Sequence, residues 1–257
     1  MYWTPPIIDS PLHSRTSSPC TVSTALEQAG IRATELVNNL ENFTAQEYME
    51  YQIIDSLHIV RESSSGMFDY VVAFQDAPGG LLLQENRNPR GGSRLSAVMT
   101  QDAGLPEIAL MFLPDIQGDY EMTCEGTASW KREPTWVVRF RQRPDKRSRT
   151  LSFRSPNAIY PAKLKGRAWI STDSGEVLHM ETSLMDEIPS ANVRAWYLSI
   201  DYAPVQFRTR PVKIWLPQTV DAYYEFDDHR TIVYHTFTNF LLFSVDTIQK
   251  FDKPQEP

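Results

Sequence analysis

The sequence predicts a mainly β protein of the α+β class. One large antiparallel sheet is expected, together with an N-terminal helix and a short second helix. The second half of the chain alternates apolar and polar residues almost continuously, which is typical of strands with one buried face. Residues 22–40 instead repeat apolar residues every three or four positions, which predicts an amphipathic helix. Long strands at short spacing indicate a large sheet that must curl or be covered by that helix.

The chain has 257 residues, a length that fits one large all-β domain. Residues 1–20 contain four prolines and four serines without periodicity, so we expect a disordered Pro/Ser-rich arm there and a single β domain over residues 21–257. No apolar run approaches the roughly 20 residues that a membrane-spanning helix requires.

The first helix is expected over residues 24–41, with Thr24 and Glu27 as a capping box at its start. Its sheet-facing residues are predicted to be Leu26, Ala29, Ala33, Leu36 and Val37. At Phe43 the period changes to two and predicts a strand that reaches Ile53, although Glu47 interrupts its apolar face.

Residues 67–74 alternate likewise, and residues 88–94 (NPRGGSR) predict a loop. A short helix is expected within LPEIALMFLP, with Pro106 in its first turn and Pro114 ending it. In the strand that follows, Trp136, Val138 and Phe140 should face inward while Arg139, Arg141 and Arg143 face solvent.

Two hairpins complete the predicted sheet of at least seven strands. Residues 166–184 form two alternating runs around a turn in which Gly175 is expected to take a positive φ. The last two long strands should turn near Asp227 and Asp228.

No recognised motif for catalysis, nucleotide binding or metal binding is present, so we expect no catalytic residues, no metal site and no cofactor. The five histidines show no ligand spacing, and His229 is interpreted as part of a solvated turn. His179 and Glu181 share one strand face, but sequence alone cannot show a paired acid and base. Cys20 and Cys124 are interpreted as two unrelated thiols, with pairing in an oxidising compartment as the alternative.

The charge is strongly polarised along the chain. Between residues 131 and 167 twelve basic residues face only two acidic ones, a local charge of +10, so the rest of the −7 chain carries −17. Such a stretch predicts contact with an anionic membrane surface or an acidic protein partner, and a solvated sheet face is the alternative. Nucleic acid is disfavoured because the whole chain is acidic and lacks a recognition motif. The candidate residues are Arg139, Arg141, Arg143, Lys146, Arg147 and Arg149.

Aromatic residues in the predicted strands either fill the core or line an apolar pocket. If the sheet curls and only one helix, about 10–12 Å wide, covers it, the apolar surface left uncovered would form a cavity; for a carrier protein we expect a cavity of several hundred Å³. The candidate pocket residues are Phe68, Tyr70, Phe74, Trp169, Trp196, Trp215, Tyr234 and Phe240.

The helix leading into LENFTAQEY, the segments GRAWISTDSGEVLHMET and IDYAPVQF, the LP of IWLPQTV, and YHTFTNFLLFSVDT together resemble a group of exported bacterial proteins. That group is similar to the outer-membrane lipoprotein carrier (LolA-like) and lipoprotein-chaperone superfamily. The resemblance covers roughly residues 24–250 and is strongest over residues 166–246. It implies a large curved antiparallel sheet, a half-open β-barrel, with the N-terminal helix and the short second helix on its apolar concave side, where acyl chains bind. It also implies a periplasmic or exported location. The first residues show no signal-peptide pattern, so a cytoplasmic location remains the alternative.

These observations predict a non-enzymatic envelope module that carries a lipid or a lipoprotein acyl chain in an apolar groove. The first alternative is an envelope scaffold protein with a packed core that uses the basic face of residues 131–167. A hydrolase is the remote alternative.

Overall fold

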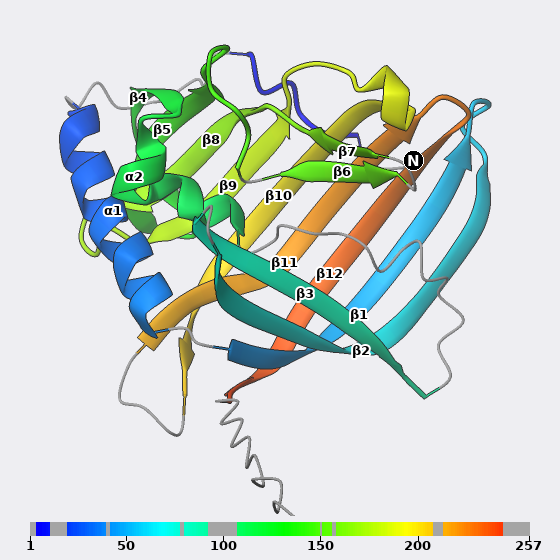
Figure 1. Ribbon diagram of the computed structural model, residues 1–257, viewed down its shortest axis with the longest axis horizontal. Helices are drawn as coiled ribbons and strands as arrows, with labels where there is room; N and C mark the ends of the chain where they lie inside the picture. Colours follow the sequence, from blue (N-terminus) through cyan, green and yellow to red (C-terminus); the bar gives the residue numbers. More distant parts are fainter. Residues whose placement is uncertain are drawn as a thin grey trace, which may run out of the picture.

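Ten strands form one antiparallel sheet in the computed structural model, and the sheet curves without closing (Figure 1). The structure describes residues 4–10, 20–39, 42–77, 80–91, 107–149, 151–155, 158–207 and 213–243. Within these ranges the sheet order is β3-β2-β1-β12-β11-β10-β9-β8-β5-β4, so β3 and β4 are its edges. The predicted fold class is confirmed.

The strands of the large sheet are β1 (Asn42–Asp55), β2 (Val60–Ala77), β3 (Gly80–Arg90), β4 (Tyr120–Trp130), β5 (Glu133–Gln142), β8 (Leu164–Ser171), β9 (Val177–Leu184), β10 (Val193–Gln206), β11 (Lys213–Phe226) and β12 (His229–Leu242). A separate hairpin pairs β6 (Ser152–Ser155) with β7 (Ala158–Pro161). The predicted loop over residues 88–94 is wrong in its first part, because Asn88–Arg90 pair with β2 as the end of β3. Residues 92–94 lie outside the described residues.

Helix α1 (Val22–Asn39) lies across the concave side near the β4 edge (Figure 1). It begins two residues before the predicted start, so Thr24 lies inside the helix and does not cap it. Its buried residues are all small, namely Ala25, Ala29, Gly30 and Ala33. A Cβ atom on Gly30 would lie 3.3 Å from the carbonyl oxygen of Phe112, so a small residue allows this close approach.

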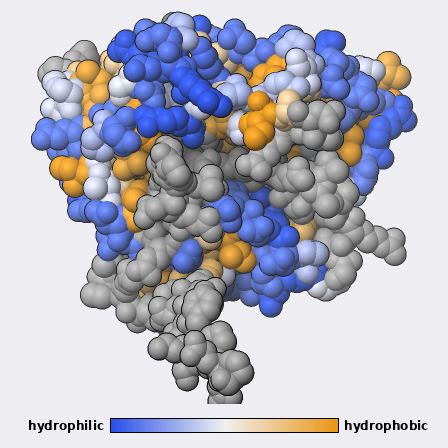
Figure 2. All heavy atoms as spheres, in the orientation of Figure 1, coloured by the Kyte–Doolittle hydropathy of each residue, from blue (hydrophilic) through white to orange (hydrophobic). Residues whose placement is uncertain are grey.

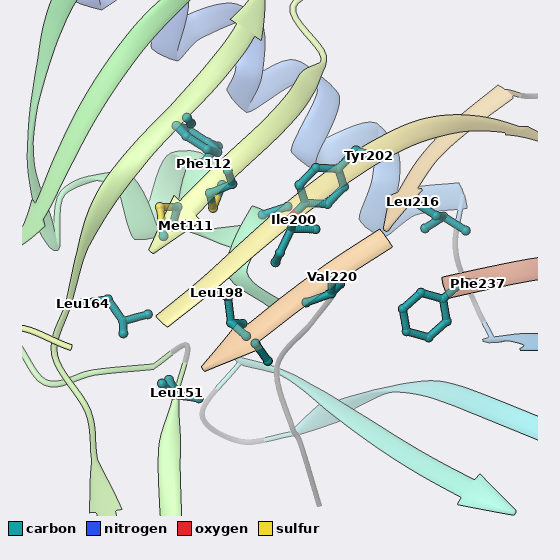
Figure 3. Close-up of a cluster of buried hydrophobic side chains, with 14 of the residues drawn as sticks. Met111, Phe112, Leu151, Leu164, Leu198, Ile200, Tyr202, Leu216, Val220 and Phe237 are labelled. Carbon is teal, nitrogen blue, oxygen red and sulfur yellow. The ribbon is translucent and has the colours of Figure 1, made fainter. Parts of the chain in front are cut away.

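The rest of the concave cover comes from the 3₁₀ helix η2 (Glu107–Phe112), the short helix α2 (Pro114–Gln117) and the β6–β7 hairpin. The predicted short helix is η2, which ends at Phe112, two residues before Pro114. Pro114 itself occupies the first turn of α2, and Pro106 lies outside the described residues. Met111 and Phe112 are fully buried, and in Figure 3 they belong to the same apolar cluster as Leu164 of β8 and Ile200 of β10. The main core therefore lies between the concave face and these covering elements.

Two features confirm the predicted hairpins. Gly175 has a φ of +74°, and its N–H donates to the carbonyl oxygen of Ser171 in the β8–β9 turn. A Cβ atom there would lie 2.8 Å from the Cβ atom of Gln28, so this turn packs directly on α1. The β11–β12 hairpin turns at Asp227 and Asp228, as expected.

The N-terminal segment Thr4–Ser10 lies against the convex face of the sheet, on the side opposite α1. Ile8 is only 4% exposed and packs in a second apolar cluster with Ile54, Tyr197, Tyr223 and Ile232. Residues 1–3 and 11–19 of the predicted arm lie outside the described residues.

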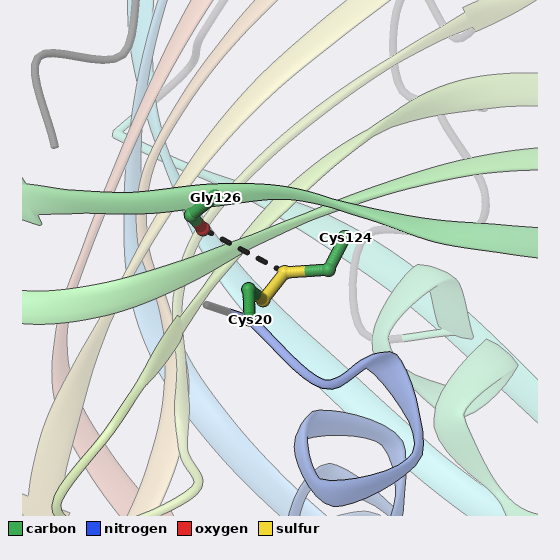
Figure 4. Close-up of a disulfide and its surroundings, with 3 residues drawn as sticks. All are labelled: Cys20, Cys124 and Gly126. Atoms are coloured by element: carbon green, nitrogen blue, oxygen red, sulfur yellow. Dashed lines mark hydrogen bonds between the residues drawn. A yellow bond between two sulfur atoms is a disulfide. The ribbon is translucent and has the colours of Figure 1, made fainter. Parts of the chain in front are cut away.

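Cys20 and Cys124 form a disulfide bond, so the interpretation as unrelated thiols is wrong (Figure 4). The bond links the residue just before α1 to the edge strand β4, and the Cys124 Sγ atom lies 3.6 Å from the carbonyl oxygen of Gly126. Spacing could not reveal the pair because 104 residues separate the two cysteines. The start of α1 is thus covalently anchored to the sheet.

No helix among the described residues is both long and apolar enough to span a membrane.

Candidate functional site

A cleft of about 60 Å³ opens beneath α1, against strands β9, β10 and β11. Apolar residues from the helix and from the sheet form much of its lining: Ala29, Ala33, Leu36, Ala109, Val177, Ile214 and Trp215. Charged side chains also border the cleft, from Arg32 and Glu35 on the helix and from Glu176 and Lys213 on the sheet side. The cleft is smaller than the several hundred Å³ that we expected from the sequence.

Tyr202 of β10 gives the cleft a polar group. Its side chain is 7% exposed, and Figure 3 shows it on the side of the sheet that α1 covers. The hydroxyl has no hydrogen-bond partner among the described residues. Burial raises the pKa of Tyr202 well above its usual value, so the hydroxyl keeps its proton and can donate a hydrogen bond. Buried unpaired hydroxyls cost free energy, so a ligand oxygen placed here would gain a bond that the free protein lacks.

The border of the cleft is tied to the β8–β9 turn through Arg32. Arg32 Nε donates to the carbonyl oxygen of Ser174 at 2.8 Å and lies 3.7 Å from Glu176 Oε1. Burial raises the pKa of Glu176 to about 7, with Arg32 opposing this shift and Glu35 adding to it. Glu176 therefore changes charge near neutral pH.

This pKa predicts how stability depends on pH. Because the folded-state pKa is above the usual value of 4.5, Glu176 costs stability as the pH rises from about 4.5 to about 7. We expect Glu176→Gln to raise the free energy of unfolding at pH 8 by on the order of 2 kcal/mol, and to change it little at pH 4.5. Urea unfolding at both pH values measures this, with Glu121→Gln, at an exposed glutamate of β4, as the matched control. An equal effect of Glu176→Gln at both pH values would contradict the prediction.

The predicted aromatic residues do not form one pocket. Trp215 lines the cleft, while Tyr70 and Phe240 both contact Phe43 around a hollow that has no room for a water molecule. Phe68 and Trp196 are buried in the main core. The side chain of Phe74 lies outside the described residues.

Trp169 and Tyr234 lie on the convex face, where alternation places them away from the main core. Tyr234 packs against the apolar cluster around Ile8. Trp169 lies at the edge of the His179 ring, 4.9 Å between centroids, and Trp130 stacks on that ring at 3.7 Å. His179 Nδ1 is 2.8 Å from Asp201 Oδ1.

His179 lies between two carboxylates, with Glu181 Oε1 3.8 Å from Nε2 on the side away from Asp201. Desolvation would lower the pKa of His179, but Asp201 and Glu181 outweigh it and raise the pKa above its usual value. Lys131 Nζ also contacts Asp201, at 2.9 Å. The cluster fastens the tip of the β4–β5 hairpin to β9 and β10.

A second charged group is buried on the concave face. Glu47 Oε2 accepts a hydrogen bond from Arg87 Nε at 2.7 Å, and Glu47 Oε1 lies 2.7 Å from His235 Nδ1. The three side chains are at most 1% exposed. Arg87 also lies over the ring of Tyr70, 5.0 Å from its centroid. Glu47, which interrupts the apolar pattern of the sequence, is thus the centre of an ion cluster.

The predicted basic residues divide into two groups. Arg139 and Arg141 lie on the convex side of β5, where Arg139 Nη2 is 2.9 Å from Asp9 Oδ1 and Arg141 is exposed. Arg143, Lys146, Arg147 and Arg149 follow β5 and are exposed. Lys146 Nζ is 4.0 Å and Arg149 Nη2 is 2.8 Å from carboxylate oxygens of Asp119, so part of this charge is balanced within the chain.

No group of three or more His, Cys, Asp or Glu side chains in the described ranges is arranged to hold a metal ion. The candidate pocket residues chosen from the sequence did not include Tyr202, Arg32 or Glu176. The alternation of RAWYLSIDY placed Tyr202 on an apolar strand face, but its missing hydrogen-bond partner depends on the fold.

No family model matches the sequence, and no curated protein matches it. Among solved structures, the chain is similar to a DUF1329 family protein from Desulfovibrio piger, with a TM-score of 0.44, 9% identity, and coverage of 86% of this chain and 92% of that one. It is also similar to a LolA superfamily protein from Nitrosomonas europaea, with a TM-score of 0.38, 11% identity, and coverage of 88% and 96%. The structures similar to this chain therefore include a member of the LolA superfamily, which the sequence also resembles.

Proposed function

We propose that the protein is a non-enzymatic binding module that holds the acyl chain of a lipid or lipoprotein between α1 and the concave face of the sheet. The observation that carries the proposal is the cleft beneath α1, with its largely apolar lining and the unpaired, buried hydroxyl of Tyr202. An acyl chain would occupy the apolar part, and a carboxyl or ester oxygen at its end would accept the hydrogen bond of Tyr202.

The cleft must widen for this function, because ligand sites usually measure about 300–1,000 Å³. Helix α1 is suited to such a movement, since its buried contacts come from small residues. Each buried alanine methyl group contributes about 0.8 kcal/mol, and each acyl methylene group buried in exchange contributes the same amount. A few methylene groups therefore offset the loss of these helix contacts.

The disulfide supports the same mechanism. It anchors the beginning of α1 to β4, whereas Leu36 and Asn39 of the cleft lie in the last turn, far from this anchor. Only residues 40 and 41 join the C-terminal end of α1 to β1, so we expect a limited outward shift of this end that widens the cleft while the helix stays on the sheet. Disulfides persist in oxidising compartments, which supports an exported protein of the cell envelope.

A fluorescent fatty acid tests the proposal. We expect the purified protein to bind the probe at micromolar concentration and to release it when unlabelled phospholipid is added. Ala33→Trp, which fills the cleft from the helix side, should abolish binding. Tyr202→Phe removes only the hydroxyl and should weaken binding about 3- to 10-fold, the effect of one hydrogen bond.

Leu241→Trp on the exposed end of β12 is the matched control, because it adds the same indole away from the cleft. No probe binding by the wild-type protein would exclude the acyl-binding function. Equal binding by wild type and Ala33→Trp would place the probe somewhere else.

A further inference from the structure

The convex face carries four cations in an arrangement that costs stability. Arg139 on β5 lies opposite Arg167 on β8, and Arg141 lies opposite Lys165 in the same register. Like charges directly opposite each other on neighbouring strands are destabilising. We call Arg139, Arg141, Lys165 and Arg167 the cation quartet.

The sheet balances only part of this charge. Glu125 on β4 contacts Arg167 Nε at 2.5 Å and lies 4.0 Å from Arg139. Glu121 and Glu181 are the strand neighbours of Arg141 and Arg167. Lys165 has no ion-pair partner from the sheet among the described residues, so an anion is still needed there.

The N-terminal segment supplies this anion. Asp9 Oδ2 is 2.5 Å from Lys165 Nζ and Asp9 Oδ1 is 2.9 Å from Arg139 Nη2. Arg167 Nη2 donates to the carbonyl oxygen of Ser10 at 2.6 Å. The cations hold the pKa of Asp9 below its usual value, with Lys165 as the main cause.

An apolar anchor accompanies the acidic one. The N–H of Ser10 donates to the carbonyl oxygen of Ile7, so residues 7–10 form a turn with Ile8 and Asp9 at its centre. Ile8 enters the convex apolar cluster while Asp9 lies on the quartet. The convex face thus recognises a turn in which an aliphatic residue precedes an acidic one.

The contacts that hold Thr4–Ser10 on the sheet are weak for a segment that is a permanent part of the fold. Asp9 is 45% exposed, and Ile7 is 75% exposed. Thr4–Ser10 makes no backbone–backbone hydrogen bond to the sheet within the described ranges; Arg167 reaches it only through a side chain. Exposed ion pairs contribute little stability, so a competing segment can displace this one.

We propose that this face is a docking site for a partner protein, which presents a turn with an aliphatic residue followed by two or more acidic residues. Thr4–Ser10 occupies the site as an internal substitute with a single carboxylate. Being part of the chain, it competes at a high effective concentration. A partner segment with additional carboxylates overcomes that advantage because it also reaches Arg141, which has no ion-pair partner among the described residues.

The test uses the full chain with both Ile8→Ser and Asp9→Ser, which should detach Thr4–Ser10 from the docking site. We call this protein the released variant. Synthetic peptides with the sequences TPPIIDS, TPPIIDDE and TPPIINS are titrated by NMR, which detects millimolar affinities. We expect TPPIIDDE to bind the released variant at least 10-fold more tightly than the wild-type protein. TPPIIDS should bind the released variant more weakly than TPPIIDDE, TPPIINS should not bind, and added salt should weaken binding.

Two further variants separate the outcomes. Adding Arg139→Glu and Lys165→Glu to the released variant should remove binding, whereas Arg147→Glu, outside the quartet, should not. Asp9→Lys alone keeps the Ile8 side chain in the sequence and serves if the released variant unfolds; repulsion between the introduced lysine and the cation quartet should displace Thr4–Ser10 and open the site to TPPIIDDE. A folded variant that binds none of the peptides would overturn the proposal. A wild-type dimer that dissociates on Ile8→Ser and Asp9→Ser would assign the site to a second copy of this chain and overturn the partner.

Discussion

Glu47→Ala is expected to lower the free energy of unfolding by about 3–5 kcal/mol, the usual cost of removing one partner of a buried ion pair. The substitution leaves the Arg87 guanidinium, 1% exposed, without the carboxylate that it contacts at 2.7 Å. It also removes the carboxylate oxygen next to His235 Nδ1. Urea unfolding at pH 7 measures the loss.

A paired substitution gives the control. In Glu47→Leu with Arg87→Met, both charges are replaced by apolar groups, which is often close to neutral for buried pairs. The double variant should therefore be more stable than Glu47→Ala, although it carries more changes. The single variants Glu47→Leu and Arg87→Met complete the comparison. Stability losses of these two variants that simply add up in the double variant would contradict the prediction, because residues in contact couple.

The ion cluster of Glu47, Arg87 and His235 also makes the free energy of unfolding depend on pH in the acid range. Burial alone would raise the pKa of Glu47, but Arg87 and His235 outweigh burial and lower the pKa. Since the folded-state pKa lies below the usual 4.5, this contribution is present above pH 4.5 and is lost as the pH falls through the folded value.

The sequence predicted helix α1, most of the long strands and, within each of them, which residues share a face, but it missed β3, β4 and the β6–β7 hairpin. Alternation placed Val138 and Phe140 in the core and Arg139 and Arg141 on the opposite side, and both assignments are confirmed. It did not say which face is concave, so Trp169 and Tyr234 were grouped with residues that point the other way. Trp169 lies two residues after Arg167 in the same strand, so the two side chains share a face. The charged Arg167 was therefore the available sign that Trp169 faces away from the core.

Contacts between distant strands could not be predicted. Glu47 was visible as a break in an apolar face, but its partners lie 40 and 188 residues away and meet it only because β3 and β12 lie near β1 in the sheet order. The cleft likewise depends on contacts between segments that are far apart in the sequence. Arg32 and Ser174 are 142 residues apart, and the small residues of α1 reveal a close approach only once the opposing surface is known.

The disulfide is the other feature whose removal should have a large effect. It closes a loop of 104 residues, and the chain-entropy model gives about 4.7 kcal/mol for a loop of about 100 residues. Cys20→Ser with Cys124→Ser is therefore expected to lower the free energy of unfolding by about 2–5 kcal/mol, because the unfolded chain gains freedom.

The reduced wild-type protein provides the matched control. With a reductant present, wild type and the double variant should unfold at the same urea concentration, whereas under oxidising conditions only wild type should gain stability. The consequence for α1 is separate from global stability. If the disulfide anchors the helix while its far end lifts, the double variant should release the fatty-acid probe faster than the oxidised wild-type protein. Equal release rates, together with a loss of stability, would mean that the bond stabilises the fold without guiding the helix.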